Sequence, residues 1–172
     1  ARVEAQDDVS TTGRANPSEC ILPDVFLAAL KRLNPQVEEG VLQGILRNFR
    51  KDYTATDMVE TNYKLYNQLR NGIKKPVRKN GKEDFDIVRL IDFDHPERND
   101  FHCVNQMWIK GHYRYRRPDV LLFVNGLPVV FIELKNSTVK VEESYNKNLT
   151  SYRKDIPNIF SFNQICVLSN GL

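Results

Sequence analysis

The sequence predicts a mixed α/β (α+β) domain in which helices flank a central mixed β-sheet and the N-terminal half is helical. Apolar residues recur at helical spacing up to about residue 72 and at the spacing of extended strands after about residue 85. Two apolar segments meet at Asn125-Gly126, which is a strong signal for a β-hairpin. A strand, a helix and a further strand follow, and this order implies a right-handed crossover between parallel strands.

Length and composition are those of one globular domain. A chain near 172 residues buries roughly 70% of the surface that its unfolded form exposes, so a real core is possible. No apolar run approaches the ~20 residues of a membrane span, and we expect no membrane partner. The three cysteines lie far apart and outside any metal-binding spacing, which favours a reducing cytoplasm. The net charge of +3 excludes little.

Helices are predicted in the first half. Residues 1–21 show no periodicity, so we expect a loose lead-in before a domain that covers residues 22–172. Both ends of the sequence look cut, and we expect a longer polypeptide. Three helices should follow, from Pro23 to Leu33, over 36–50, and from the Thr56-Asp57 cap to Asn71-Gly72.

Strands are predicted in the second half. A basic loop should cover 73–84, and strands should cover Asp86–Asp92 and Phe101–Ile109. After the hairpin, a helix is expected over about 140–155 and a last, buried strand over Gln164–Leu168.

The register of the hairpin brings charged residues together. Because Leu127-Pro128 follows the turn, we expect a loop of more than two residues, centred on Gly126. Cross-strand partners then include Leu121 with Phe131, and Asp119 with Glu133. Both faces of the paired strands are apolar, which predicts a central pair covered on both sides. Alternation along the strand places Lys135 on the same face as Glu133.

Two carboxylates that face each other at the edge of an apolar surface need positive charge nearby. Lys135 supplies one charge, and a hard divalent cation such as Mg²⁺ is a better match to paired carboxylates. A metal-bound water beside an ammonium group is suited to attack on a phosphodiester. The alternative is an ordinary salt bridge at strand ends, because Asp followed by Glu-x-Lys is a short pattern.

A cluster of basic and aromatic residues precedes Asp119. It contains Lys110, His112, Tyr113, Arg114, Tyr115, Arg116 and Arg117. Such interleaving suits a nucleic-acid backbone, and we expect Arg114, Arg116 and Arg117 to contact DNA phosphates. The alternative is a solvated surface loop.

Asp119 and Glu133-Leu-Lys135 together resemble the PD-(D/E)xK nuclease signature. The string RRPDVLLFVNGLPVVFIELKN, residues 116–136, closely resembles the N-terminal nuclease domain of the restriction (R) subunit of type I restriction-modification enzymes. Further matching segments lie in the expected order over residues 22–172. They are Leu69–Gly72, Val88–Asp92, Asn99–Phe101, Asn105-Gln106, Asp155–Pro157 and Leu168–Gly171.

The resemblance implies a restriction-endonuclease-like core and Mg²⁺-dependent cleavage of double-stranded DNA, with Mn²⁺ as a substitute metal. Asp119 and Glu133 would be metal ligands, and Lys135 would position the attacking water or the phosphate. It also implies modification and specificity subunits as partners, and an ATP-driven motor in the full-length subunit. No Gly-x-x-x-x-Gly-Lys-Ser/Thr loop occurs here, so ATP is expected to act only in the longer protein.

Asn148 departs from the pattern of the family, and Glu60 would extend it. The family often carries Gln-x-x-x-Tyr after the Glu-x-Lys strand, where this chain has Asn148 and Tyr152. The resemblance implies a catalytic role for Tyr152, whereas Asn148 is one methylene shorter than Gln. Related nucleases recruit an acid from an early helix, and Glu60 is the candidate, with a solvated helix residue as the alternative.

Other functions remain open at this point. One is a PD-(D/E)xK nuclease of a DNA repair system. Another is a noncatalytic DNA-binding or subunit-docking domain that retains the nuclease fold. Retention of Asp119, Glu133 and Lys135 favours the enzyme.

Overall fold

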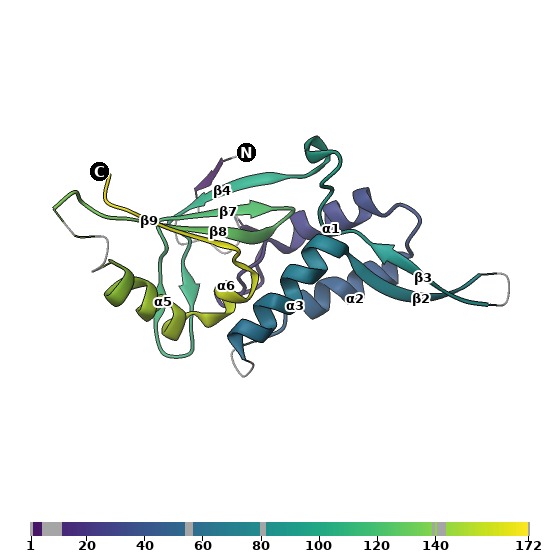
Figure 1. Ribbon diagram of the computed structural model, residues 1–172, viewed down its shortest axis with the longest axis horizontal. Helices are drawn as coiled ribbons and strands as arrows, with labels where there is room; N and C mark the ends of the chain where they lie inside the picture. The colour runs from purple at the N-terminus through teal and green to yellow at the C-terminus, as the bar shows by residue number, and fades with distance from the viewer. Residues whose placement is uncertain are drawn as a thin grey trace.

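The computed structural model describes residues 2–4, 12–53, 57–79, 82–138, 140 and 144–171. Its centre is a five-stranded mixed sheet, which confirms the predicted fold class (Figure 1). The strands lie in the order β1 (Arg2–Glu4), β4 (Phe101–Asn105), β7 (Val120–Val124), β8 (Leu127–Leu134) and β9 (Ile165–Ser169). The β1–β4 and β8–β9 pairs are parallel, and the two pairs between them are antiparallel.

The three N-terminal helices are confirmed. They are α1 (Pro23–Leu33), α2 (Glu39–Phe49) and α3 (Met58–Asn71). Pro23 occupies the first turn of α1, where its missing N–H costs nothing, and the Asp57 carboxylate caps α3 by accepting the Glu60 amide at 2.8 Å. Buried apolar residues of all three helices form one core cluster with Leu127, at the start of β8. These helices therefore enclose the turn end of the β7–β8 hairpin.

A C-terminal helical layer covers one face of the sheet. It consists of the π-helical turn η3 (Ser144–Leu149), α5 (Thr150–Asp155) and α6 (Pro157–Phe162). Phe131 of β8 packs against the rings of Tyr152, at 5.3 Å between centroids, and Phe160, at 5.4 Å. The helix expected over 140–155 is confirmed from Ser144 onwards, while 141–143 lie outside the described residues. Helix α6 was not predicted, because Pro157 was interpreted only as a helix end and is also a favourable start.

The predicted basic loop at 73–84 is wrong. Residues Ile73–Lys79 and Lys82–Val88 form an antiparallel hairpin, β2–β3, which projects to the right in Figure 1. Among the described side chains of this ribbon only Val88 is buried, while Phe85 and Ile87 are 61% and 50% exposed, so the strands need little apolar alternation. The strand expected over Asp86–Asp92 accordingly ends at Val88.

The structure differs from two further predictions near the N-terminal edge of the sheet. Part of the expected loose lead-in, Arg2–Glu4, is strand β1, although the predicted boundary between lead-in and domain stays a prediction. The strand expected over Phe101–Ile109 is interrupted at Gln106, whose φ of +50° is in the left-handed region. The chain then continues as a small hairpin of β5 (Ile109–Lys110) and β6 (Tyr115–Arg116).

The sheet is covered on one face only by the described residues, so the prediction of cover on both sides is wrong. Leu121, Phe123 and Phe131 are fully buried on the helix-covered face. On the opposite face β7 and β8 are half-buried, and Leu134 is 50% exposed. Strand β9 pairs in parallel with β8 as expected, yet Ile165 is 55% exposed, so this strand is not buried.

The turn of the β7–β8 hairpin has two residues, which corrects the expectation of a longer loop. Asn125 and Gly126 have φ of +50° and +80°, as a type I′ turn requires, and Val124 pairs with Leu127. The register shifts between Leu122 and Phe123 because β8 carries one extra residue there. Beyond this bulge Leu121 pairs with Phe131, as the sequence predicted.

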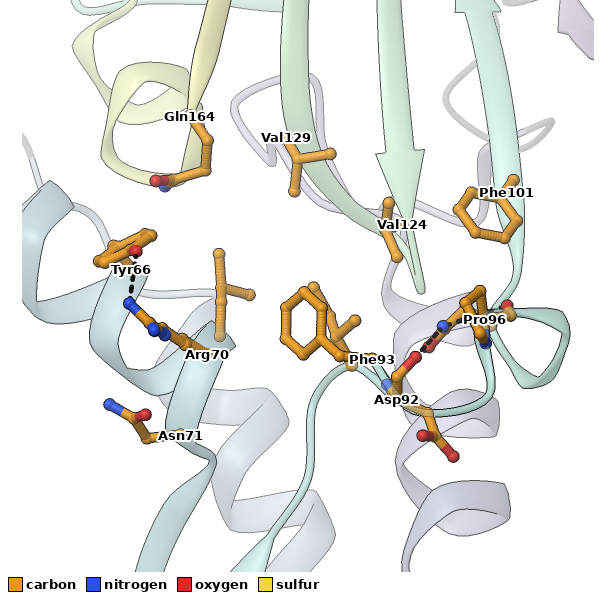
Figure 2. Close-up of a pocket in the computed structure, with 13 residues that line it drawn as sticks. Tyr66, Arg70, Asn71, Asp92, Phe93, Pro96, Phe101, Val124, Val129 and Gln164 are labelled. Atoms are coloured by element: carbon orange, nitrogen blue, oxygen red, sulfur yellow. Dashed lines mark hydrogen bonds between the residues drawn. The ribbon is translucent and has the colours of Figure 1, made fainter.

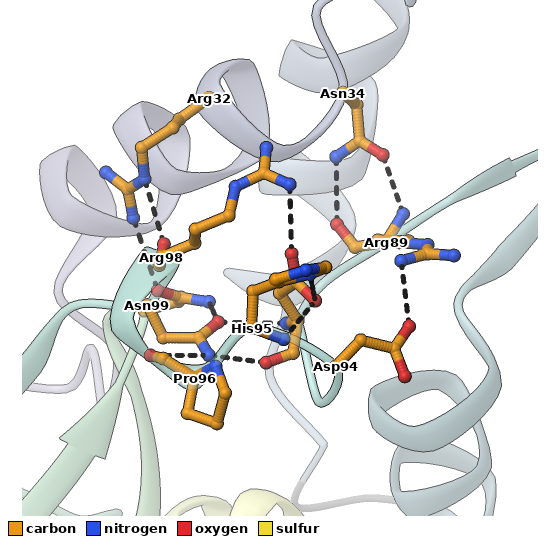
Figure 3. Close-up of polar contacts among 10 residues, drawn as sticks. Arg32, Asn34, Arg89, Asp94, His95, Pro96, Arg98 and Asn99 are labelled. Atoms are coloured by element: carbon orange, nitrogen blue, oxygen red, sulfur yellow. Dashed lines mark hydrogen bonds and ion pairs between the residues drawn. The ribbon is translucent and has the colours of Figure 1, made fainter.

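A polar network ties the end of α1 to the loop that precedes β4 (Figure 3). Asn34, at the end of α1, exchanges two hydrogen bonds with the backbone of Arg89, at 2.7 and 2.8 Å. Buried Asp92 accepts the Arg98 guanidinium at 3.1 Å from the 3₁₀ helix η2 (Pro96–Arg98). Fully buried Asn125 donates to the carbonyl of Leu90 at 2.8 Å. Among the described residues, no helix is both long and apolar enough to cross a membrane.

Replacing Gly126 by alanine should destabilise the protein. A Cβ at this position would lie 2.5 Å from the Leu22 carbonyl oxygen and 2.8 Å from the Phe26 nitrogen, and its φ of +80° is unfavourable for alanine. We expect a loss of roughly 1–3 kcal/mol in the free energy of unfolding, measured by urea titration. The control is Gly40→Ala in α2, where nothing lies within 4 Å, and it should not destabilise. Equal effects of both changes would contradict the role of the turn.

Candidate functional site

The charged ends of β7 and β8 meet as the sequence predicted. Val120 pairs with Ile132, so Asp119 and Glu133 occupy the next opposed positions and continue the face of Leu121 and Phe131. The Asp119 carboxylate accepts a hydrogen bond from the Leu134 amide at 2.7 Å, which fixes one of its oxygens, Oδ2. The bulge is what allows this meeting, because a two-residue turn without it would offset the two carboxylates by one residue.

Glu133 is a buried carboxylate with incomplete compensation. The residue is 3% exposed, and its Oε1 accepts the Lys135 ammonium at 2.5 Å. Among the residues that the structure describes, none donates a hydrogen bond to the buried Oε2. An unpartnered carboxylate oxygen in a buried position is costly, and a hard cation is one of the few groups that offset this cost. The donor set of Asp119 and Glu133 therefore fits Mg²⁺ or Mn²⁺.

Two residues of the C-terminal helical layer border the carboxylates. The Tyr152 hydroxyl donates to the Arg117 carbonyl at 3.2 Å. Burial, followed by the negative charge of Glu133, raises the pKa of Tyr152 well above its usual value, so this hydroxyl keeps its proton to a higher pH than an exposed tyrosine does. The Asn148 amide lies 3.5 Å from Glu133 Oε1, which is too long for a strong hydrogen bond. A glutamine here would reach one methylene further.

The three arginines differ in their surroundings. Arg116 forms an ion pair with Asp155 at 2.5 Å, and its guanidinium lies 5.6 Å from the centre of the Tyr152 ring. Arg117 is exposed and stacks over Trp108 at 5.2 Å. Arg114 is exposed near the tip of the β5–β6 loop. Phosphate contacts by these arginines stay a prediction.

Within the described part of the chain, no group of three or more His, Cys, Asp or Glu side chains is placed to hold a metal ion. No third acid of that part therefore joins Asp119 and Glu133. Glu60 is exposed in the first turn of α3, next to the capping Asp57. Its role as an additional acid stays a prediction.

An apolar cavity of about 670 Å³ lies at the other end of the hairpin (Figure 2). Tyr66 and Arg70 of α3 border it on one side, and Phe93 and Pro96 border it on the other. Val124 and Val129, from the turn end of β7 and β8, form its floor, so the whole length of the strands separates it from Asp119 and Glu133. Its apolar lining does not suit phosphodiester chemistry.

Sequence reasoning missed the residues that brace the loop between β5 and β6. Asp155 anchors Arg116, and the backbone of Gly111 packs against the carbonyl of Asp155. The sequence signal was a glycine within a run of basic and aromatic residues, which often marks a close approach of two backbone segments. The partner of that approach is 44 residues away (155 − 111), so spacing gave no indication of it.

A helix-flanked mixed sheet with Asp119, Glu133 and Lys135 at one end of its central hairpin defines the class of PD-(D/E)xK nuclease-like domains. Residues 2–172 match the family model described as type I restriction enzyme R protein N terminus, and the chain belongs to this family.

Curated relatives agree with this assignment. The chain is 32% identical over 163 residues to the type I restriction enzyme HindI endonuclease subunit of Haemophilus influenzae, covering 92% of this chain and 15% of the relative. It is also 32% identical over 167 residues to the putative type I restriction enzyme MjaIXP endonuclease subunit of Methanocaldococcus jannaschii, covering 92% and 16%. The chain therefore spans about one sixth of the length of these relatives.

Replacing Tyr152 by phenylalanine should make stability less sensitive to alkaline pH. The pKa of Tyr152 is raised above 10.0 in the folded state. As pH rises, the Tyr152 hydroxyl therefore loses its proton first in the unfolded chain. The contribution of the neutral hydroxyl is therefore complete below about pH 10 and is lost as pH rises towards the folded-state pKa. Between about pH 8 and pH 11, urea unfolding should show a smaller decline for the variant than for the parent.

The control for this experiment is Tyr63→Phe on α3, where the tyrosine is 66% exposed. This variant should decline as the parent does. Identical pH dependence of all three proteins would contradict the raised pKa that burial and the charge of Glu133 give Tyr152.

Proposed function

We propose that this chain is the Mg²⁺-dependent nuclease domain of a type I restriction subunit and hydrolyses phosphodiester bonds in double-stranded DNA. The observation that carries the proposal is the buried Glu133, whose Oε2 has no donor among the described residues and which lies opposite Asp119. A salt bridge alone would account for Oε1 and Lys135, but it leaves Oε2 unexplained.

Each residue of the site has a distinct task in this proposal. Asp119 and Glu133 would hold the metal ion, which would polarise the phosphoryl oxygens and lower the pKa of a bound water. The hydrogen bond from the Leu134 amide keeps the Asp119 carboxylate in one orientation. Lys135, whose side chain is 26% exposed and whose ammonium pairs with Glu133, would orient the attacking water or the scissile phosphate.

The surrounding residues would hold the DNA and the carboxylate layer. Arg114 and Arg117 are exposed and would neutralise backbone phosphates, whereas Arg116 would exchange part of its contact with Asp155 for a phosphate. Tyr152 would support the site by keeping a neutral hydroxyl beside Glu133. A direct catalytic role for Tyr152, and the recruitment of Glu60, belong to the same proposal.

The wider complex is proposed from the relatives, which are named as endonuclease subunits of type I restriction enzymes. In that setting the chain would act in the cytoplasm as part of a longer subunit that uses ATP for a DNA motor. Modification and specificity subunits would be its protein partners, and the specificity subunit would choose the DNA sequence.

Metal binding is the first test of the proposal. Calorimetric titration of Mg²⁺ and Mn²⁺ into the chain, with and without a short duplex, should show binding to the parent. Asp119→Ala and Glu133→Gln should each weaken the binding by more than about tenfold. Asp94→Asn, whose side chain is 74% exposed in the loop before η2, is the matched control and should bind as the parent does. Equal binding by all four proteins would refute the carboxylate pair as the metal site.

Replacing Lys135 by alanine should separate metal binding from catalysis. The change removes a cation 2.5 Å from Glu133, so affinity for Mn²⁺ should be kept or increased. Nicking of supercoiled plasmid in Mn²⁺ should fall by roughly a hundredfold or more, because the group that orients the nucleophile is lost. Loss of metal binding together with nicking would show instead that Lys135 only supports the fold of the site.

A further inference from the structure

The loop between β5 and β6 is held in one conformation by contacts at its base. The Gly111 amide donates to the Arg114 carbonyl at 2.8 Å, and the Lys110 amide donates to the Pro17 carbonyl at 3.0 Å. A Cβ on Gly111 would lie only 1.7 Å from the Asp155 carbonyl oxygen, so the loop backbone rests directly on the end of α5. The loop is therefore a braced element of the fold.

The braced loop presents aromatic and basic side chains to solvent at its tip. Tyr113 is 89% exposed, and its ring meets the His112 ring edge-to-face at 4.6 Å. Lys110, which pairs with Tyr115 across the hairpin, and Arg114, which follows Tyr113 in the sequence, are also exposed, and among the described residues neither forms an ion pair. In contrast to Arg116, which is committed to Asp155, these two cations are available to an anionic partner.

The tip is physically connected to the carboxylate site. Arg116 leaves the loop and lies over the Tyr152 ring, and the next carbonyl, that of Arg117, accepts the Tyr152 hydroxyl. Asp119 follows two residues later. Figure 1 shows the β5–β6 hairpin alongside α5, the helix that carries Tyr152.

An exposed aromatic ring on a loop that also carries two exposed cations fits one ligand chemistry best. A nucleobase that has left its stack offers a π-face to the ring, and its flanking phosphates offer charge to the cations. A base inside an intact duplex offers no free face, so the ring would select DNA that is locally unpaired or distorted.

We propose that Tyr113 stacks on an unpaired base while Lys110 and Arg114 hold the flanking phosphates, so that the chain engages locally unpaired DNA next to its nuclease site. This inference rests on the proposed nuclease function for the identity of the polymer. It extends that function by naming the form of DNA and the residue that recognises it.

DNA binding without metal tests the inference independently of the carboxylates. Fluorescence anisotropy in EDTA would compare an intact duplex with the same duplex carrying a gap of two nucleotides, using the 172-residue chain. The parent should bind the gapped duplex more tightly. Tyr113→Ala should lose about tenfold in affinity for the gapped duplex and little for the intact one, whereas Tyr113→Phe should behave as the parent does.

Two further variants complete the experiment. Arg114→Ala should weaken binding to both duplexes and lower the salt dependence, because it removes a phosphate contact. Tyr63→Ala, which removes a 66% exposed tyrosine from α3, is the control and should change neither affinity.

The inference is overturned if the parent does not distinguish the two duplexes, or if Tyr113→Ala matches Tyr63→Ala on both. Equal losses on both duplexes would also overturn it, since Tyr113 would then be a general backbone contact. A failed metal titration combined with selective loss in Tyr113→Ala would refute the proposed catalytic function and leave the base contact standing.

Discussion

The register of the β7–β8 hairpin is the constraint on which the candidate site depends. A two-residue turn at Asn125-Gly126 sets one register, and the bulge that follows changes it by one residue before the strands end. Only the changed register places Asp119 opposite Glu133 on the helix-covered face. Side chains alternate along a strand, so an error of one residue would send one carboxylate to the opposite face of the sheet. The buried Asn125 and the close approach of Gly126 to α1 therefore stabilise the site from the opposite end of the strands.

The second feature of the site is a buried carboxylate whose charge is only partly compensated. Glu133 is buried beside Asp119 with one ammonium partner, while Tyr152 contributes a neutral hydroxyl whose pKa is raised by burial and then by the same negative charge. Proteins seldom keep an unpartnered buried carboxylate oxygen, because desolvation disfavours it. Such an arrangement is typical of positions where function outweighs local stability. In the proposed function, a metal ion rather than a second salt bridge would compensate this oxygen.

The loop before Asp119 and the helices after Lys135 form one unit. Asp155 at the end of α5 holds Arg116, and Tyr152 of the same helix contacts both Arg116 and the Arg117 carbonyl. Segments far apart in the sequence thus fix the β5–β6 loop relative to the carboxylates. The chain covers about one sixth of its relatives, and this small part nevertheless contains the whole carboxylate and lysine group.

The sequence by itself determined the mixed sheet, the three N-terminal helices and the meeting of Asp119 with Glu133, because periodicity and turn chemistry are local signals. The sequence did not determine the bulge. The expected loop was too long by one residue and the expected strand lacked the one extra residue of the bulge, and these two errors cancelled, so the predicted pairing of Leu121 with Phe131 was still correct. The β2–β3 hairpin was missed because only Val88 is buried among its described side chains, so its strands need little apolar alternation. Only the tertiary structure decided that Glu133 Oε2 lacks a donor among the described residues, and that Asp155 braces the loop between β5 and β6. Burial and long-range pairing depend on which segments meet in space, and local spacing does not contain that information.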